Sequence, residues 1–269
     1  MQYVLGYLLA SLVGVSLGLI GSGGSILTVP ILVYIFGVEA SLATAYSLFI
    51  VGSTALVGGI HRAYYKKVHF KTAIIFGVPA IASVYATRLW LMPIIPKIIF
   101  ETDTFVLTKD IALMLIFAIF MIFASISMIR SGNNKNVETE DTKPIKYNLL
   151  MIFLDGMGVG VLTGLVGAGG GFLIIPALVF FAGLSMRLAI GTSLFIIAAK
   201  SLIGFIGDLQ GNQTIDWHLL IGFTVASVIG IFVGIYINRF FSSAKLKKGF
   251  GWFVLVMGIY IVVKELFGN

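Results

Sequence analysis

The stretch Gly18-Leu-Ile-Gly21-Ser-Gly23-Gly24-Ser25-Ile-Leu-Thr-Val-Pro30 interrupts a long apolar segment with glycines and then places a proline. The same pattern returns as Gly164-Leu-Val-Gly167-Ala-Gly169-Gly170-Gly171-Phe-Leu-Ile-Ile-Pro176. At this fixed offset, residues 14–49 and 160–195 are identical at 17 of 36 positions, far more than apolar bias alone would give. The chain therefore contains an internal duplication. Glycine and proline breaks at matching positions of two halves indicate the binding site of a membrane transporter.

The composition is that of a helical membrane protein. Of the 269 residues, 59% are hydrophobic and 11% are charged, and the mean hydropathy is +1.07. The apolar runs are continuous, as in spanning helices, and do not alternate as the strands of a β-barrel do. The net charge of +7 gathers in short loops, which is typical of membrane proteins and does not indicate nucleic-acid binding. There is no cysteine, so disulfides and thiolate metal sites are excluded.

The apolar segments predict an all-α polytopic membrane protein with about ten transmembrane or partly spanning helices, five in each half. Residues 1–130 form the first predicted repeat, 131–146 a polar linker, and 147–269 the second repeat. The segments at 24–37 and 170–182 are short for straight spanning helices, which leaves open whether they cross the bilayer or are re-entrant. The predicted segments are 3–20, 24–37, 42–60, 70–92, 105–129, 147–166, 170–182, 187–207, 217–238 and 249–267.

The charges of equivalent loops predict that the two repeats have inverted topology. The loop at 61–67 is basic, but its counterpart at 208–216 is acidic, and the next pair of loops shows the opposite bias. Basic loops face the cytoplasm, so equivalent loops lie on opposite sides of the membrane. Five segments per half satisfy this condition. We therefore expect a cytoplasmic linker, with both termini outside.

Both glycine-rich stretches are candidate anion sites. Glycine permits close backbone approach, and a helix that begins beside it directs free N–H groups and a positive dipole end at the break. The backbone donors would come from Ser22, Gly23, Gly24 and Ser25 in the first stretch and from Ala168, Gly169, Gly170 and Gly171 in the second. The alternative is that glycines only allow helices to pack closely. Gly14, Gly18, Gly160 and Gly164 fit that alternative well.

Polar side chains in the following segments extend the candidate site. Ser47 and Ser193 fall at equivalent positions of the two halves, and Thr192 is the counterpart of Tyr46; the hydroxyls of Ser47, Thr192 and Ser193 either bind an anion or form ordinary interhelical bonds. Lys200 lies well inside an apolar segment, and an intramembrane cation is a functional candidate because its burial is costly. Its partner would be a bound anion or Asp155. Asp155 is also a candidate proton carrier, whereas Arg88 is expected to snorkel from a segment end.

The two glycine motifs, each followed by a proline and a Ser-Leu-Phe segment, resemble the repeated signature of the TauE/SafE sulfite exporter family. The resemblance covers essentially the whole chain, and the second copy, with Gly191-Thr192-Ser193, is the closer match. The first copy departs from it at Ser25 and Tyr46. Membership would imply a secondary transporter of sulfite, organosulfonates or related sulfur oxyanions in a bacterial inner membrane.

These observations together predict an alternating-access transporter of a small anion, held near the midplane where the two breaks converge. The expected partners are the anion, the lipid bilayer and, as a candidate coupling ion, the proton. No cofactor, metal or nucleic acid is expected. One alternative is an anion channel built on the same site. An intramembrane enzyme is disfavoured, because three histidines and few buried carboxylates assemble no acid–base–nucleophile set. The exact anion, the direction of transport and the oligomeric state stay open.

Overall fold

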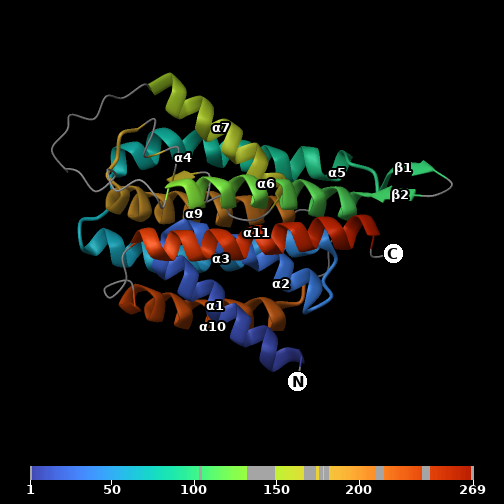
Figure 1. Cartoon of the computed structure of the whole chain (residues 1–269). Helices are drawn as coiled ribbons and strands as arrows, with labels where there is room; N and C mark the ends of the chain where they lie inside the picture. The colour runs from blue at the N-terminus through green and yellow to red at the C-terminus, as the bar shows by residue number, and fades with distance from the viewer. Residues whose placement is uncertain are drawn as a thin grey trace.

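The predicted apolar segments are mostly helices in the computed structural model of the chain (Figure 1). This structure describes residues 2–102, 105–131, 149–166, 174, 175, 178, 182–209, 215–237 and 243–267. The long helices in these ranges are α1 (Gln2–Ile20), α3 (Ala40–Tyr64), α4 (Phe70–Ala86), α6 (Lys109–Ser131), α7 (Leu149–Val166), α9 (Met186–Leu209), α10 (Trp217–Ile237) and α11 (Ser243–Phe267). The predicted linker lies outside the described residues.

Several of these helices are long and apolar enough to cross a bilayer. Within the described residues they are α3, the run from Phe70 to Ile94 that begins with α4, the part of α9 from Leu188, and α10. The outer face of α10 is apolar too, because Ile221, Val225 and Phe232 are each exposed over about half of their surface. An apolar face of this kind suits lipid and not water. The chain is a helical, multi-pass membrane protein.

The first glycine-rich stretch changes the course of the chain, as the sequence predicts. α1 ends at Ile20, a 3-10 helix (η1) follows over Gly21–Leu27, and the short helix α2 spans Thr28–Tyr34. Gly21 has a φ of 74°, a left-handed conformation that side chains with a Cβ rarely adopt. The second stretch, 167–173, lies outside the described residues.

The end of the fourth segment differs from the prediction. The helical run ends at Ile94, close to the predicted residue 92, but it passes through an unpredicted π-helical turn (η2, Thr87–Leu91) before α5 (Met92–Ile94). A hairpin of two antiparallel strands, β1 (Ile98–Thr102) and β2 (Phe105–Thr108), follows and leads into α6. The sequence did not predict these strands: β1 falls in the expected loop after residue 92, and β2 in the start of the expected apolar segment 105–129.

The two halves pack against each other in corresponding pairs. α1 packs along α10 at one edge of the bundle, and α7 packs along α4 at the opposite edge (Figure 1). Gly14 of α1 abuts the backbone of Ser227, and Gly160, its counterpart in α7, abuts the backbone of Ala80. The close-packing alternative is therefore right for these glycines.

The helices α3 and α9 form the centre of the bundle and run antiparallel. Leu48 of α3 lies beside Gly204, Gly52 lies beside Leu202, and Gly59 lies beside Phe195. These two helices occupy equivalent positions of the duplicated sequence. The pair α6 and α11, again one helix from each half, packs together on another side.

The bundle has two distinct ends. α3 and α10 run in the same direction, because Tyr46 bonds to Asp216 at their starts and Gly58 lies beside Ile231 further along. We call the end with the start of α3, the strands and the end of α9 the hairpin end. We call the end with residues 61–71, the start of α9 and the end of α10 the basic end, after Arg62, Lys66, Lys67 and Lys71.

Candidate functional site

Lys200 lies near the middle of α9 and is completely buried. Its neighbour Leu202 contacts Gly52, which stands halfway along α3. The Lys200 Nζ donates a hydrogen bond of 2.8 Å to the hydroxyl of Thr163 on α7. A cation at this depth with a neutral partner is costly, since burial removes its hydration without supplying an opposite charge. The structure thus keeps Lys200 as a candidate anion contact.

Asp155 does not neutralise Lys200. The ion pair that the structure gives among the described residues joins Arg88 and Asp208, not Asp155 and Lys200. Asp155 is partly exposed on α7, and its buried Oδ2 has no hydrogen-bond partner in the described part of the chain. The alternative of a structural Asp155–Lys200 pair is therefore wrong.

Arg88 is the functional candidate that the sequence reasoning missed. It lies in the π-helical turn and is only 2% exposed, so it does not snorkel. Its Nη1 donates to the Thr44 hydroxyl at 3.0 Å and lies 3.4 Å from Asp208 Oδ2. The signal was present in the apolar run 89–95, which continues past Arg88 and places it inside the protein.

The predicted hydroxyls do not converge on one point. Ser47 lies near the hairpin end of α3, whereas Thr192 and Ser193 lie near the basic end of α9. Because Leu48 is level with Gly204 and Phe195 with Gly59, Ser47 and the Thr192–Ser193 pair are roughly 20 Å apart along the helix pair. A small anion cannot contact both at once. The expectation of a single site that includes all three is therefore wrong.

Each of these hydroxyls has its own surroundings. The Thr192 hydroxyl accepts a hydrogen bond of 2.9 Å from the backbone N–H of His69, and the Ser193 hydroxyl donates to the Ile190 carbonyl at 2.9 Å. Ser47 is fully buried, and its hydroxyl has no partner among the described residues. Of the predicted hydroxyls, Ser47 therefore has the most hydrogen-bonding capacity left.

The glycine-rich stretches contribute less than expected to the described structure. Ser25 is fully buried inside the 3-10 helix that also contains Ser22, Gly23 and Gly24. In such a helix each N–H bonds to the carbonyl three residues earlier. An anion bound here would have to replace some of these bonds. Ala168, Gly169, Gly170 and Gly171 lie outside the described residues.

Two matching hydrogen bonds close the two ends of the bundle. At the hairpin end, the Tyr46 hydroxyl of α3 accepts from the backbone N–H of Asp216, just before α10. At the basic end, Thr192 of α9 accepts from His69, the residue just before α4. Tyr46 and Thr192 are counterparts in the duplicated sequence. Each bond also joins one half of the chain to the other.

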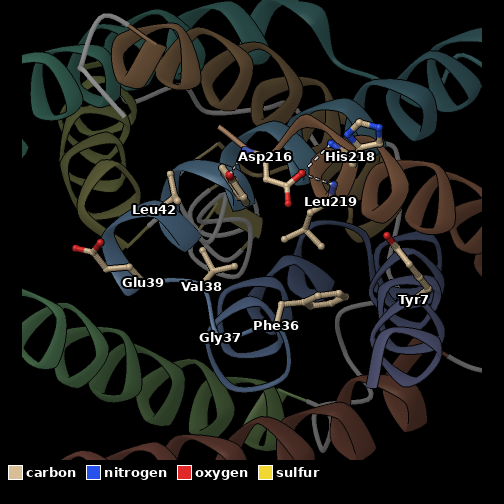
Figure 2. Close-up of a pocket in the computed structure, with 10 residues that line it drawn as sticks. Tyr7, Phe36, Gly37, Val38, Glu39, Leu42, Asp216, His218 and Leu219 are labelled. Carbon is tan, nitrogen blue, oxygen red and sulfur yellow. Dashed lines mark hydrogen bonds between the residues drawn. The ribbon is translucent and has the colours of Figure 1, made fainter. Parts of the chain in front are cut away.

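A cavity of about 530 Å³ opens at the hairpin end, beside the first of these bonds. Tyr7, Phe36, Glu39 and Asp216 are among its lining residues, and Glu39 and Tyr7 lie on opposite sides of it in Figure 2. The Asp216 carboxylate accepts from the backbone N–H groups of His218 and Leu219. The cavity leads from the surface toward Tyr46.

Comparison with known proteins identifies similar membrane proteins. The sequence profile of the family described as sulfite exporter TauE/SafE matches residues 7–261. A probable membrane transporter protein of Xylella fastidiosa is 28% identical over 93% of this chain and 91% of its own length. One from Bacillus subtilis is 24% identical over 99% of this chain and 100% of its own length. One from Haemophilus influenzae is 28% identical over 96% and 97%. No solved structure matches the chain.

Proposed function

Because the chain belongs to the sulfite exporter TauE/SafE family, we propose that it is a secondary transporter that exports sulfite or an organosulfonate. The relatives named as probable membrane transporter proteins, which it matches over nearly their full length, support transport as its activity. We place it in a bacterial inner membrane. The burial of the cation Lys200 supports a small anion as the substrate.

The observation that carries the proposal is the burial of Lys200 without an acidic partner among the described residues. A protein that never bound an anion would gain stability by replacing this lysine with an apolar residue. Its place halfway along the central helix pair is where transporters bind their substrates. We therefore propose that the anion contacts Lys200 near the middle of the membrane. Backbone groups of Ser22–Ser25 and of 168–171 reach it during part of the cycle.

The fold supports transport by rocking of two inverted halves, 1–130 and 147–269, joined by the linker. The equivalent helices α3 and α9 run antiparallel. α1 is equivalent to α7 and α10 to α4, so the packing of α1 against α10 corresponds to the packing of α7 against α4. Inverted repeats of this kind alternate access by moving against each other around a fixed site. Under this proposal the Ser47 hydroxyl donates a hydrogen bond to the anion when the site is open to the hairpin end. Thr192 and Ser193 serve it from the basic end.

Proton coupling through Asp155 is part of the proposal. Its buried Oδ2 lacks a partner in the described residues, so protonation would not break an existing bond. An Asp155→Asn variant should lose the dependence of transport on a pH gradient while it still exchanges anion. Full retention of that dependence would remove Asp155 from the mechanism.

Counterflow of labelled sulfite in proteoliposomes tests the function. Wild type should exchange sulfite across the vesicle membrane. The exchange rate of Lys200→Ala should be lower by about tenfold or more, since one charged contact is worth about 1.5–3 kcal/mol. A channel would instead give currents without counterflow. Exchange that survives in Lys200→Ala would reject Lys200 as the contact. No exchange of sulfite or of isethionate by wild type would reject the proposed substrates.

A further inference from the structure

We propose that Arg88 binds the transported anion at the hairpin end of its path, and that the Asp208 carboxylate occupies this site between transport cycles. The inference rests on the proposed function, because it assigns a second contact to the same substrate. It concerns a residue whose burial the sequence did not predict.

The first support is the unused capacity of the Arg88 guanidinium. Of its three nitrogens, only Nη1 has partners, the Thr44 hydroxyl at 3.0 Å and Asp208 at 3.4–3.5 Å. Nε and Nη2 are buried and have no hydrogen-bond partner among the described residues. A structural arginine–carboxylate pair usually forms two short parallel bonds. This pair is long and shares one nitrogen, so Asp208 holds the arginine weakly.

The second support is a set of donors around the same point. Ser47, with its buried and unpartnered hydroxyl, stands one helical turn from Thr44 and therefore on the same side of α3. Gly164 packs against Thr87, so α7 reaches Arg88 just before the second glycine-rich stretch begins at Gly167. Among the described residues, the geometry therefore brings an arginine and a hydroxyl without a partner to the same side of α3.

The third support is the charge balance. The Arg88–Asp208 pair has no net charge, so an anion gains the full attraction of the guanidinium only when Asp208 moves away. Other charged groups lie nearby, since Arg88 and Asp208 both interact electrostatically with Lys109, which in turn faces Asp110 and Glu39. Lys109 is therefore a second cation within electrostatic reach of Arg88 and Asp208. The π-helical turn that holds Arg88 is a type of distortion that is frequent at functional sites.

The alternative is a purely structural ion pair, and the two roles predict opposite results. If the pair is structural, Asp208→Asn leaves a buried charge alone and lowers both stability and transport. The double variant Arg88→Gln/Asp208→Asn would then restore transport, because neither charge remains. If Asp208 competes with the substrate, Asp208→Asn makes Arg88 more available, and the double variant stays inactive.

The test is thermal stabilisation of the purified protein by sulfite and by isethionate, with sodium gluconate as the salt control. Wild type should be stabilised with a measurable midpoint concentration. Asp208→Asn should lower this midpoint concentration by about tenfold. This is the change expected if the Asp208 carboxylate occupies the Arg88 site in about nine-tenths of the unliganded molecules. Arg88→Gln should lose the stabilisation, and Arg88→Gln/Asp208→Asn should not regain it. An unchanged midpoint in Arg88→Gln, or sulfite stabilisation restored in the double variant, would overturn the inference.

Counterflow measured on the same samples separates this inference from the proposed function. Stabilisation that depends on Arg88 without counterflow in wild type would keep the anion site and reject the transporter. Counterflow in wild type with stabilisation that does not depend on Arg88 would keep the transporter and reject the site. If neither anion stabilises wild type while counterflow occurs, the Arg88 site is rejected and the transporter is kept.

Discussion

Lys200 and Arg88 are both buried cations, but Lys200 is held by a hydroxyl and Arg88 by a carboxylate. Sequence reasoning could find Lys200, because it stands far from either end of an apolar segment. It misplaced Arg88, because the boundary of that segment was set too early. The position of Asp208 at the end of another segment gave no hint that the two would meet. Pairing between distant segments depends on how helices pack, which hydropathy does not report.

Replacement of Lys200 should show a trade between stability and function. Lys200→Met keeps the length of the side chain and removes a buried charge that has no acidic partner. We expect the melting temperature in detergent to rise by about 2–4 °C, while sulfite counterflow falls. Differential scanning fluorimetry and counterflow on one preparation measure both quantities.

Thr163→Val provides the matched control for this experiment. It removes the hydroxyl partner but keeps the Lys200 charge, so the protein should become less stable by about 1–3 kcal/mol. A fall in melting temperature for Lys200→Met as well would show that Lys200 holds the helices together and is not kept for an anion.

Among the elements, the glycines of α7 offer a direct test of helix packing. A Cβ at Gly160 would lie 2.6 Å from the Ala80 carbonyl oxygen and 2.7 Å from the Ser83 Cβ, whereas a Cβ at Gly158 would meet no atom within 4 Å. Gly160→Ala should therefore force α7 away from α4 and cost about 1–3 kcal/mol of stability. Gly158→Ala, in the same helix, should change it by less than about 1 kcal/mol.

Chemical or thermal denaturation in one detergent compares the two variants. Equal effects would mean that α7 and α4 do not pack at Gly160 in the membrane. The equivalent substitution Gly14→Ala, which meets the backbone of Ser227 on α10, should behave as Gly160→Ala does.

The sequence predicted most helices but not how some of them end. Hydropathy located α1, α3, α9 and α10 to within a few residues, because a spanning helix needs a long apolar run. It missed the π-helical turn at 87–91 and the strands at 98–108. The π-helical turn is as apolar as the helices around it, and the two strands are too short to show a clear alternation, so only backbone hydrogen bonding distinguishes them. The role of Gly21 was predictable, since a left-handed φ favours glycine at a helix break.

At the scale of the whole molecule, the hydrogen bonds of Tyr46 and Thr192 hold opposite ends closed. Each joins the start of a central helix in one half to the start of a helix in the other half. Rocking of the halves must break one of the two bonds in each state. Tyr46→Phe should therefore favour opening at the hairpin end, and Thr192→Val should favour opening at the basic end.

Cysteine accessibility can measure these openings, because the native chain contains no cysteine. Leu220→Cys reports on the hairpin end and Ala73→Cys on the basic end, where both native side chains are at most 7% exposed. We expect Tyr46→Phe to raise the maleimide labelling rate at position 220 several-fold. The hydrogen bond that it removes is worth about 1 kcal/mol, and its loss increases the open population by that factor. The rate at position 73 should not rise. Equal increases at both positions would indicate general loosening and not alternating access.

The distribution of charge predicts which end of the molecule faces the cytoplasm. Arg62, Lys66, Lys67 and Arg187 gather at the basic end, while Glu39, Asp110 and Asp216 lie at the hairpin end. Each basic residue near an anionic cytoplasmic surface is worth about 1 kcal/mol, so several together fix the orientation. We therefore expect the hairpin end, with both termini, to lie outside.

Lys71→Cys and His218→Cys test this orientation together with the inversion of the halves. Residues 71 and 218 are each the second residue of equivalent helices, α4 and α10, and both native side chains are exposed. In intact cells a membrane-impermeant maleimide should label position 218 directly and position 71 only after permeabilisation. The opposite pattern would reverse the orientation but keep the inverted halves. Labelling of both positions from the same side would reject inversion, because parallel halves place equivalent residues on one face of the membrane.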